Sequence, residues 1–118
     1  MQVNTQTTVS RFDLHLEKME ADARVRLGKK PTREEIRAYD EEKLWPLYHG
    51  RCAMCISVPA VCFHEIEPKS KRPGDWWLPT NRVPLCSICH DIVHETGTAA
   101  NAEQLRENRR RLLSVLMI

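Results

Sequence analysis

Two short stretches, Cys52-Ala53-Met54-Cys55 and Cys86-Ser87-Ile88-Cys89, decide the fold of this chain. Zinc prefers tetrahedral thiolate ligation, and a two-residue spacer lets both sulfurs of a Cys-x-x-Cys knuckle turn toward one ion. The doubled pattern predicts a single structural Zn²⁺ held by all four cysteines, with buried free cysteines as the alternative. Four protein ligands leave no position for water, so this zinc would contribute folding energy rather than chemistry.

Length and composition limit the possible architectures. A chain of 118 residues fits one compact domain with a helical extension, and 42% apolar residues give a modest core that a metal would strengthen. A formal charge of +2 is too small for a protein that coats DNA by bulk electrostatics. No apolar run is long enough to cross a bilayer, and residues 1–10 do not resemble a signal peptide. We therefore expect a cytoplasmic protein with no membrane partner. In the reducing cytoplasm, paired cysteines more often hold metal than form disulfides.

Helical signals precede the first knuckle. Residues 1–9 are polar and are expected to form a disordered tail, and residues 10–49 a helical extension. Ser10 is a candidate N-cap for a first helix, which Gly28 would stop. Thr32 and Glu35 form a capping-box pattern before a second helix, which Pro46 would end or kink. The apolar face of the first helix would carry Phe12, Leu16, Met19 and Ala23.

The cysteine-rich segment and the C-terminus follow a different pattern. Residues 58–66 are rich in strand formers and predict a short hairpin turning at Pro59 and Ala60. Residues 87–96 predict a short helix that ends at Gly97. Asn101 is expected to cap a last helix within residues 98–118, packed on the core. The apolar side of that helix would carry Leu105, Leu112 and Leu116.

Three histidines have the spacing of a second metal site. His90 and His94 are four positions apart, so a helix places both imidazoles on one face, and His64 can add a third nitrogen from a strand. Three histidines with open positions fit a catalytic cation that binds phosphate oxygen and water. His15 and His49 are interpreted as ordinary surface or core residues.

These motifs together resemble a known family. The segment His64-Glu65-Ile66-Glu67-Pro68, then Asn81, then Leu85 to His90 and His94 is similar to the HNH endonuclease motif in its zinc-knuckle form. The family includes phage-encoded and restriction-type nucleases. The resemblance covers residues 51–97 and implies an α+β, mostly helical protein. Its core, residues 50–97, would be a ββα-metal (His-Me finger) unit with a four-cysteine zinc clamp, flanked by N- and C-terminal helices.

The resemblance also implies roles for single residues. His64 matches the first metal ligand, and His90 and His94 match the later ligands. Asn81 matches the central asparagine, which orients the loop and the catalytic base in the family. The implied working cation is Mg²⁺ or Mn²⁺, although three imidazoles would also accept Ni²⁺ or Zn²⁺.

Glu65 departs from the family pattern. Most members carry a histidine there, which activates the attacking water. A carboxylate is a weaker base than imidazole at neutral pH. Three outcomes follow: Glu65 serves as the base, Glu65 joins the metal, or the enzyme is slow or inactive. The interpretation preferred here is that Glu65 is the base.

The nucleic-acid contacts are expected around the motif. Trp76 and Trp77 are expected to pack over the zinc knuckle, with contact to a base or sugar as the alternative. The expected partner is DNA, together with a phage or host DNA-processing protein in the host cytoplasm if the chain is phage-encoded. The alternative is a non-catalytic zinc module that binds DNA or a protein. The candidate phosphate contacts are Lys69, Lys71, Arg72 and Arg82.

Overall fold

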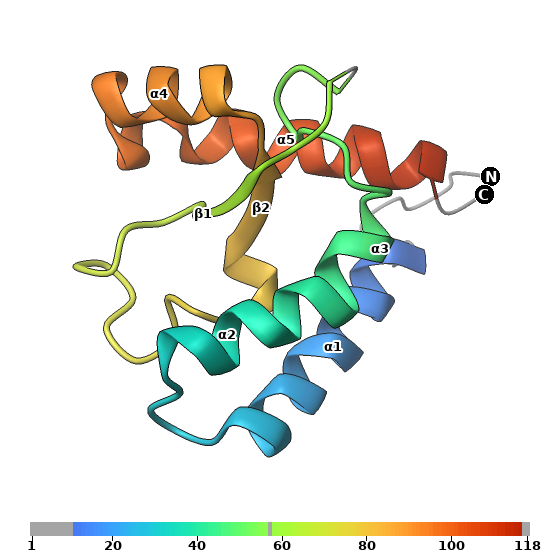
Figure 1. The fold of residues 1–118 in the computed structure, drawn as a ribbon, viewed down its shortest axis with the longest axis vertical. Coiled ribbons are helices and arrows are strands. Elements are labelled where there is room, and N and C mark those ends of the chain that lie inside the picture. Colours follow the sequence, from blue (N-terminus) through green and yellow to red (C-terminus); the bar gives the residue numbers. More distant parts are fainter. Residues whose placement is uncertain (1–10, 57, 117–118) are drawn as a thin grey trace, which may run out of the picture.

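The computed structural model describes residues 11–56 and 58–116 as a mostly helical α+β fold with one small sheet (Figure 1). The predicted tail 1–9, the helix start at Ser10 and the side chain of Phe12 lie outside the described part. No helix in the described ranges is long and apolar enough to cross a membrane. The elements are α1 (Arg11–Leu27), α2 (Arg33–Tyr39), the π-helical turn η1 (Asp40–Leu44), α3 (Trp45–Leu47), β1 (Cys62–Glu65), the 3-10 turn η2 (Pro79–Asn81), β2 (Arg82–Leu85), α4 (Ser87–Thr96) and α5 (Thr98–Leu116).

The predicted start of the second helix is confirmed. The Thr32 hydroxyl accepts a hydrogen bond from the Glu35 N–H at 3.1 Å, and the Glu35 carboxylate accepts one from the Thr32 N–H at 2.8 Å. Pro46 does not end the helix at once, because the chain passes through the wider turn η1 just before it. A proline ring clashes with the carbonyl four residues earlier in an α-helix, and a π turn opens that spacing. The helix ends one residue after Pro46.

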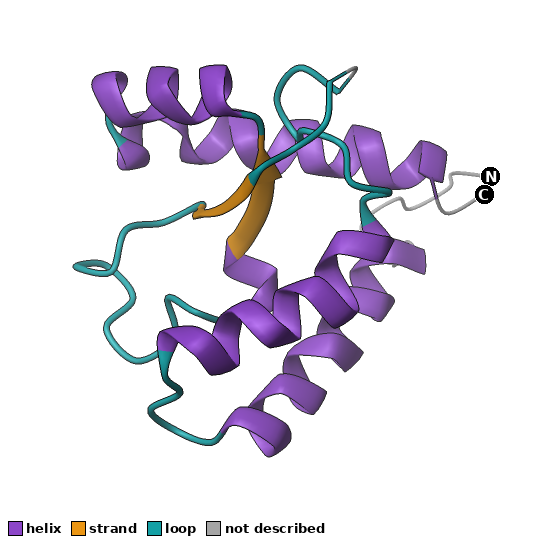
Figure 2. Cartoon of the chain, viewed as in Figure 1, coloured by secondary structure: helices purple, strands orange, loops and turns teal. Residues whose placement is uncertain are grey.

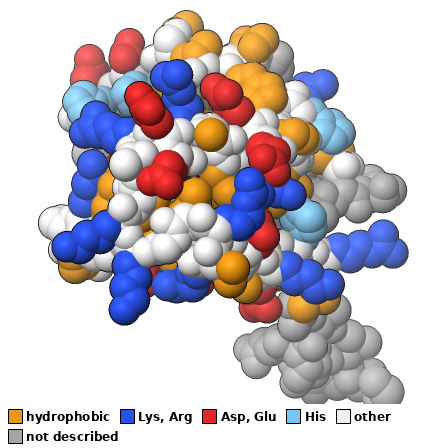
Figure 3. Space-filling model, turned by 60° about the horizontal axis from the view of Figure 1, so that its bottom comes forward, with side chains coloured by type: hydrophobic (Ala, Val, Ile, Leu, Met, Phe, Trp, Pro, Cys, Tyr) orange, Lys and Arg blue, Asp and Glu red, His pale blue; other side chains and the backbone are white. Residues whose placement is uncertain are grey.

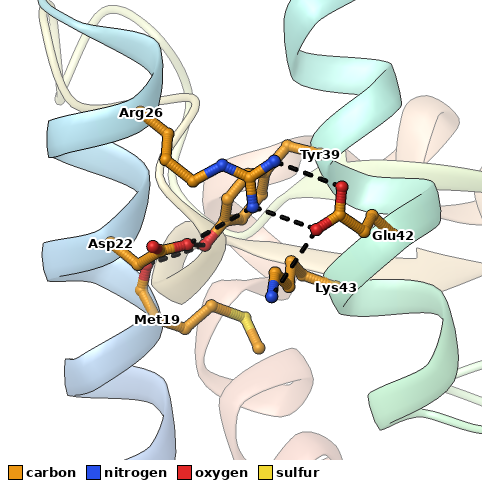
Figure 4. A network of polar contacts seen from close by, with 6 residues as sticks. All are labelled: Met19, Asp22, Arg26, Tyr39, Glu42 and Lys43. Atoms are coloured by element: carbon orange, nitrogen blue, oxygen red, sulfur yellow. Dashed lines mark hydrogen bonds and ion pairs between the residues drawn. The ribbon is translucent and has the colours of Figure 1, made fainter.

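A polar network joins α1 to α2 and η1 (Figure 4). The Arg26 guanidinium makes two contacts with the Glu42 carboxylate, at 3.0 and 3.1 Å. The Tyr39 hydroxyl lies 2.9 Å from the Asp22 carboxylate and 3.0 Å from the Met19 carbonyl. Burial and the bond to Asp22 raise the pKa of Tyr39. Tyr39 therefore stays protonated and ties the two helices together, while the exposed ion pairs add little stability.

The sheet consists of β1 and β2 alone within the described residues and lies between the helical groups (Figure 2). The strands are antiparallel, with Cys62 opposite Leu85 and Glu65 opposite Arg82. The predicted hairpin at Pro59 and Ala60 is wrong. Pro59 instead bridges back to Arg51, which closes the knuckle loop. The true partner of β1 lies beyond a long loop, where local strand propensity gives no signal.

Two apolar clusters form the core, and α5 contributes to both. Leu112 and Leu113 of α5 join the cluster between α1, α2 and α3, while Ala102 and Leu105 join the cluster under the cysteines. The last helix begins at Thr98 rather than near Asn101. The predicted packing of the tryptophans over the zinc knuckle is wrong. Both Trp76 and Trp77 belong to the cluster of the N-terminal helices.

A buried ion pair connects η1 to β2. Asp40 is 3% exposed and Arg82 is 8% exposed, and the guanidinium donates a hydrogen bond to the carboxylate. The Arg82 guanidinium also lies 5.7 Å from the centre of the Phe63 ring. Burial raises the pKa of Asp40 to about 6, although Arg82 opposes the shift. The cost of removing a carboxylate from water thus exceeds the attraction of its partner.

The raised pKa of Asp40 determines whether its contribution to the free energy of unfolding grows or falls with pH. The folded protein binds the Asp40 proton more tightly than the unfolded chain does, so unfolding becomes easier as the carboxyl ionises. The contribution of Asp40 to the free energy of unfolding is fully present below about pH 4 and is lost as the pH rises through about 6. We expect a ¹³C carboxyl titration of Asp40 with a midpoint near 6, and a higher one in Arg82→Met, where the opposing cation is gone. A midpoint near 4 in the folded protein would contradict this.

Candidate metal centre and histidine cluster

The four knuckle cysteines gather at one point. Their sulfurs all lie within 4.8 Å of one another. Cys52 and Cys55 come from the turn after α3, Cys86 follows β2 and caps α4, and Cys89 lies in the first turn of that helix. Cys62 stands outside the cluster on β1, half-buried, with its thiol 3.6 Å from the Leu85 carbonyl.

The cluster has the dimensions of a zinc site. A tetrahedral ZnS₄ centre with bonds of about 2.3 Å places its sulfurs about 3.8 Å apart. The sulfurs of Cys55 and Cys86 are 3.8 Å apart. Backbone N–H groups of Met54 and Cys55 point at the Cys52 sulfur from 3.4 Å, and the Cys89 N–H points at the Cys86 sulfur from the same distance. The residues present therefore fit a structural metal such as zinc.

The ionisation of these thiols is uneven. Burial opposes the charged form of Cys52, but backbone donors outweigh it and bring its pKa down to about 7. Burial and neighbouring sulfurs raise the pKa of Cys55 and of Cys89. Several thiolates cannot share this space without a positive charge between them. A divalent cation would supply that charge.

The three candidate histidines lie side by side. The ring centres of His64 on β1 and His90 on α4 are 5.4 Å apart, with the rings at 77°. His94, one turn further along α4, stacks on His90 with centres 5.8 Å apart. Two imidazoles that ligate one ion with bonds of about 2 Å, at tetrahedral or octahedral angles, have centres roughly 4.5 to 5 Å apart, so these rings lie somewhat further apart than ligating rings would. His15 and His49 are exposed on other elements.

The histidine cluster is looser than the cysteine cluster. Among the residues of 11–56 and 58–116, the four cysteines are the one group of three or more His, Cys, Asp or Glu side chains close enough together to hold a metal ion. The imidazoles would therefore have to move closer together around an ion. Burial lowers the pKa of His64, and His90 and His94 lower it further, while Glu65 opposes the shift. His64 is thus held in the neutral form, which is the form that ligates metals.

Asn81 fastens the loop between the two strands. Its side-chain oxygen accepts a hydrogen bond from the Glu67 N–H at 3.0 Å, and its amide nitrogen donates to the carbonyls of Glu67 and Trp76 at 3.1 and 3.0 Å. Its own carbonyl accepts from the Ile66 N–H at 2.7 Å. Asn81 is 1% exposed. One side chain therefore holds both ends of the loop beside β1.

Replacing Asn81 by alanine should loosen this loop strongly. The change leaves one backbone N–H and two carbonyls without the partner they have now, and each buried unpaired group costs about 1 kcal/mol or more. We expect the free energy of unfolding to fall by about 3 kcal/mol. Urea denaturation measures it, and proteolysis should cut the loop first. Asn81→Asp keeps the acceptor and loses the donors, so it should fall between the two proteins.

The candidate phosphate contacts are not equivalent. The Lys69 ammonium lies over the Trp76 ring, 4.1 Å from its centre, while Lys71 is exposed and Arg72 half-buried. Arg82 is not on the surface, because it is buried against Asp40, and a phosphate could reach it only by displacing that carboxylate. On the face in Figure 3, Lys and Arg side chains are mixed with Asp and Glu. The positive charge on this face is therefore confined to small groups of side chains and does not form a broad basic surface.

The sequence interpretation missed one residue of the site. Thr98, the first residue of α5, places its hydroxyl 3.3 Å from Nε2 of His64. A threonine directly after a helix-ending Gly97 is a recognisable helix start. That signal gives the start of a helix but not the neighbour across the fold.

Comparison with known proteins leaves the site to be judged on its geometry. The cysteine cluster and the histidine cluster share α4, and Asn81 holds the loop that precedes β2. No family model, no curated protein and no solved structure matches this chain.

Proposed function

We propose that this protein is a metal-dependent HNH-type endonuclease that hydrolyses phosphodiester bonds in DNA. The observation that carries the proposal is the approach of His64, His90 and His94 on a strand-loop-strand-helix unit. The order β1, loop, β2 and α4 corresponds to the ββα-metal core that the motif resemblance implies. A purely structural zinc module would need the four cysteines but not this group of imidazoles.

The three imidazoles would hold the catalytic cation. Such a cation offsets the charge that develops on the scissile phosphate and on the leaving oxygen. His64 offers a neutral ring from β1, and His90 and His94 offer two more from one face of α4. The cysteine centre at the start of α4 would fix the angle of that helix, and so the place of two of its ligands.

Glu65 is the proposed general base. It follows His64 directly on β1 and is half-exposed, so water can reach its carboxylate. In this role Glu65 takes a proton from the attacking water, and Asn81 keeps the adjoining loop in place. Products with 5′ phosphate and 3′ hydroxyl ends are expected, as in the family that the motif resembles.

The loop after β1 would carry the nucleic-acid contacts. Lys71 is exposed there, and Lys69 and Arg72 flank it. Binding that depends on a few phosphates weakens with salt in proportion to their number. This modest set supports contact beside the cut rather than tight independent binding, which is consistent with work alongside a phage or host DNA-processing protein.

A plasmid-nicking assay with Mg²⁺, Mn²⁺ or Ni²⁺ tests the proposal. His90→Ala should remove a cation ligand and Glu65→Ala the base, and each should slow nicking about 100-fold or more. Both variants should retain the zinc of the wild-type protein, because neither residue belongs to the cysteine cluster. His49→Ala is the matched control, since it removes an exposed imidazole elsewhere and should nick at the wild-type rate.

Two results would overturn the proposal. One is full cleavage by His90→Ala. The other is zinc-loaded wild-type protein that binds DNA without cutting it with any of the three cations. The second result would identify the chain as a non-catalytic zinc module.

A further inference from the structure

We infer that Thr98 is a positioning residue for His64 and determines which ring nitrogen of His64 faces the cation. The inference rests on the proposed cation site. It starts from the contact of 3.3 Å between the Thr98 hydroxyl and Nε2 of His64. The two residues are 34 positions apart in the sequence, so the contact is made by the fold and not by the local chain.

The turn between α4 and α5 brings Thr98 to this place. Gly97 ends α4 with φ of +102°, a value that side chains other than glycine adopt rarely, and its N–H bonds to the Val93 carbonyl at 2.8 Å. The Asn101 amide donates to the Gly97 carbonyl at 2.7 Å and to the Thr96 hydroxyl at 2.6 Å. A turn fastened on both sides leaves the first residue of α5 little freedom. Thr98 therefore meets His64 from the side of α5.

The chemistry of imidazole gives this contact its consequence. A nitrogen engaged by a hydroxyl is not free to ligate an ion, so His64 would use Nδ1 for the cation. Neutral histidine carries one proton, and ligation through Nδ1 requires that proton on Nε2. The Thr98 oxygen is then the acceptor for the Nε2–H. Metal-ligating histidines commonly donate their second ring N–H to an oxygen in this way, which fixes both the tautomer and the ring orientation.

Burial protects the contact between Thr98 and His64 from water. His64 is 8% exposed, and Thr98 is half-buried, so bulk water has limited access to replace the hydroxyl. Glu65 is the next residue along β1, but Thr98 is the residue whose side chain makes a hydrogen-bond contact with the His64 ring. Removing the hydroxyl would leave the Nε2–H with a poorer partner and the ring less restrained.

Calorimetric titration with Ni²⁺ or Mn²⁺, on protein whose zinc site is filled, tests the inference without using cleavage. Thr98→Val keeps the shape and loses the hydroxyl, and affinity for the cation should fall about 10- to 100-fold. Thr98→Ser keeps the hydroxyl and should bind within about threefold of wild type. Thr96→Ser changes the same turn but keeps the hydroxyl that accepts the Asn101 hydrogen bond, so it should bind like wild type. In ¹⁵N spectra, the Nε2–H form of His64 should dominate in wild type and lose population in Thr98→Val.

His64→Ala separates the two possible failures. If His64→Ala weakens cation binding and Thr98→Val does not, the role of Thr98 is refuted while the cation site stands. If His64→Ala has no effect on cation binding, the proposed cation site itself is refuted. A dominant Nδ1–H form of His64 in wild type would also overturn the inference, because ligation would then use Nε2.

Discussion

Replacing Cys86 by serine should release zinc and unfold the C-terminal half of the protein. Cys86 is one of the four clustered ligands, caps the start of α4 and is buried in the apolar cluster around β2. Structural zinc contributes an apparent 10 to 16 kcal/mol, roughly, to the folding of small zinc peptides. Small domains have a total stability of about 5 to 15 kcal/mol. The free energy lost with the metal therefore exceeds the stability that the remaining apolar contacts provide.

Metal analysis and circular dichroism measure this effect. Cys86→Ser should contain much less than one zinc per chain and should lose a cooperative thermal transition, and a chelator should do the same to wild type. Cys62→Ser is the matched control, because Cys62 is half-buried nearby but outside the cluster. It should keep its zinc and lose less than about 1 kcal/mol. A zinc-free Cys86→Ser protein with the wild-type melting temperature would contradict the prediction.

Replacing Asp40 by alanine should be the next most damaging change and should lower the free energy of unfolding by about 3 to 5 kcal/mol. It leaves the Arg82 guanidinium buried between η1 and β2 with no carboxylate to accept its hydrogen bond. Near pH 7 the pair is charged on both sides, since burial raises the pKa of Asp40 only to about 6. The variant is destabilised because it leaves a buried cation without a partner. Urea denaturation at pH 7 measures the fall in the free energy of unfolding.

Two further variants define the origin of that loss. Glu41→Ala removes the carboxylate next to Asp40 from an exposed pair with Arg37 and should change stability by less than about 0.5 kcal/mol. The double variant Asp40→Leu with Arg82→Met removes both charges and should recover most of the loss, because apolar side chains of similar volume can replace a buried pair. If the double variant is as unstable as Asp40→Ala, shape rather than charge is the cause.

The features that the sequence predicted best depend on short-range chemistry. Thr32 and Glu35 satisfy each other within one helical turn, and Gly97 ends α4 for reasons contained in its own backbone. The approach of the four cysteines was also predictable, because one metal requires a common centre for both knuckles. His90 and His94 share a face because both lie on one short helix. In each case the spacing along the chain carries the geometry.

The features that the sequence could not give depend on distant partners. The strand at Cys62 pairs with Leu85 instead of with its neighbours, since pairing across a loop is decided by the whole core. Arg82 looked like a phosphate ligand, but Asp40 from another element neutralises it in the interior. The contact of Thr98 with His64 likewise exists only once α5 has packed. No local sequence pattern predicts these long-range contacts.

The π-helical turn between α2 and α3 holds one residue more than an ordinary helical turn. Each residue in an α-helix advances the rotation by about 100°. Because the wider turn absorbs the extra residue, Tyr48 faces as it would in a regular helix one residue shorter. Both tyrosines are buried in the same cluster. Straightening Asp40–Leu44 into ordinary α-helix without shortening it would therefore rotate Tyr48 by roughly 100° relative to Tyr39 and turn one of the two rings out to solvent.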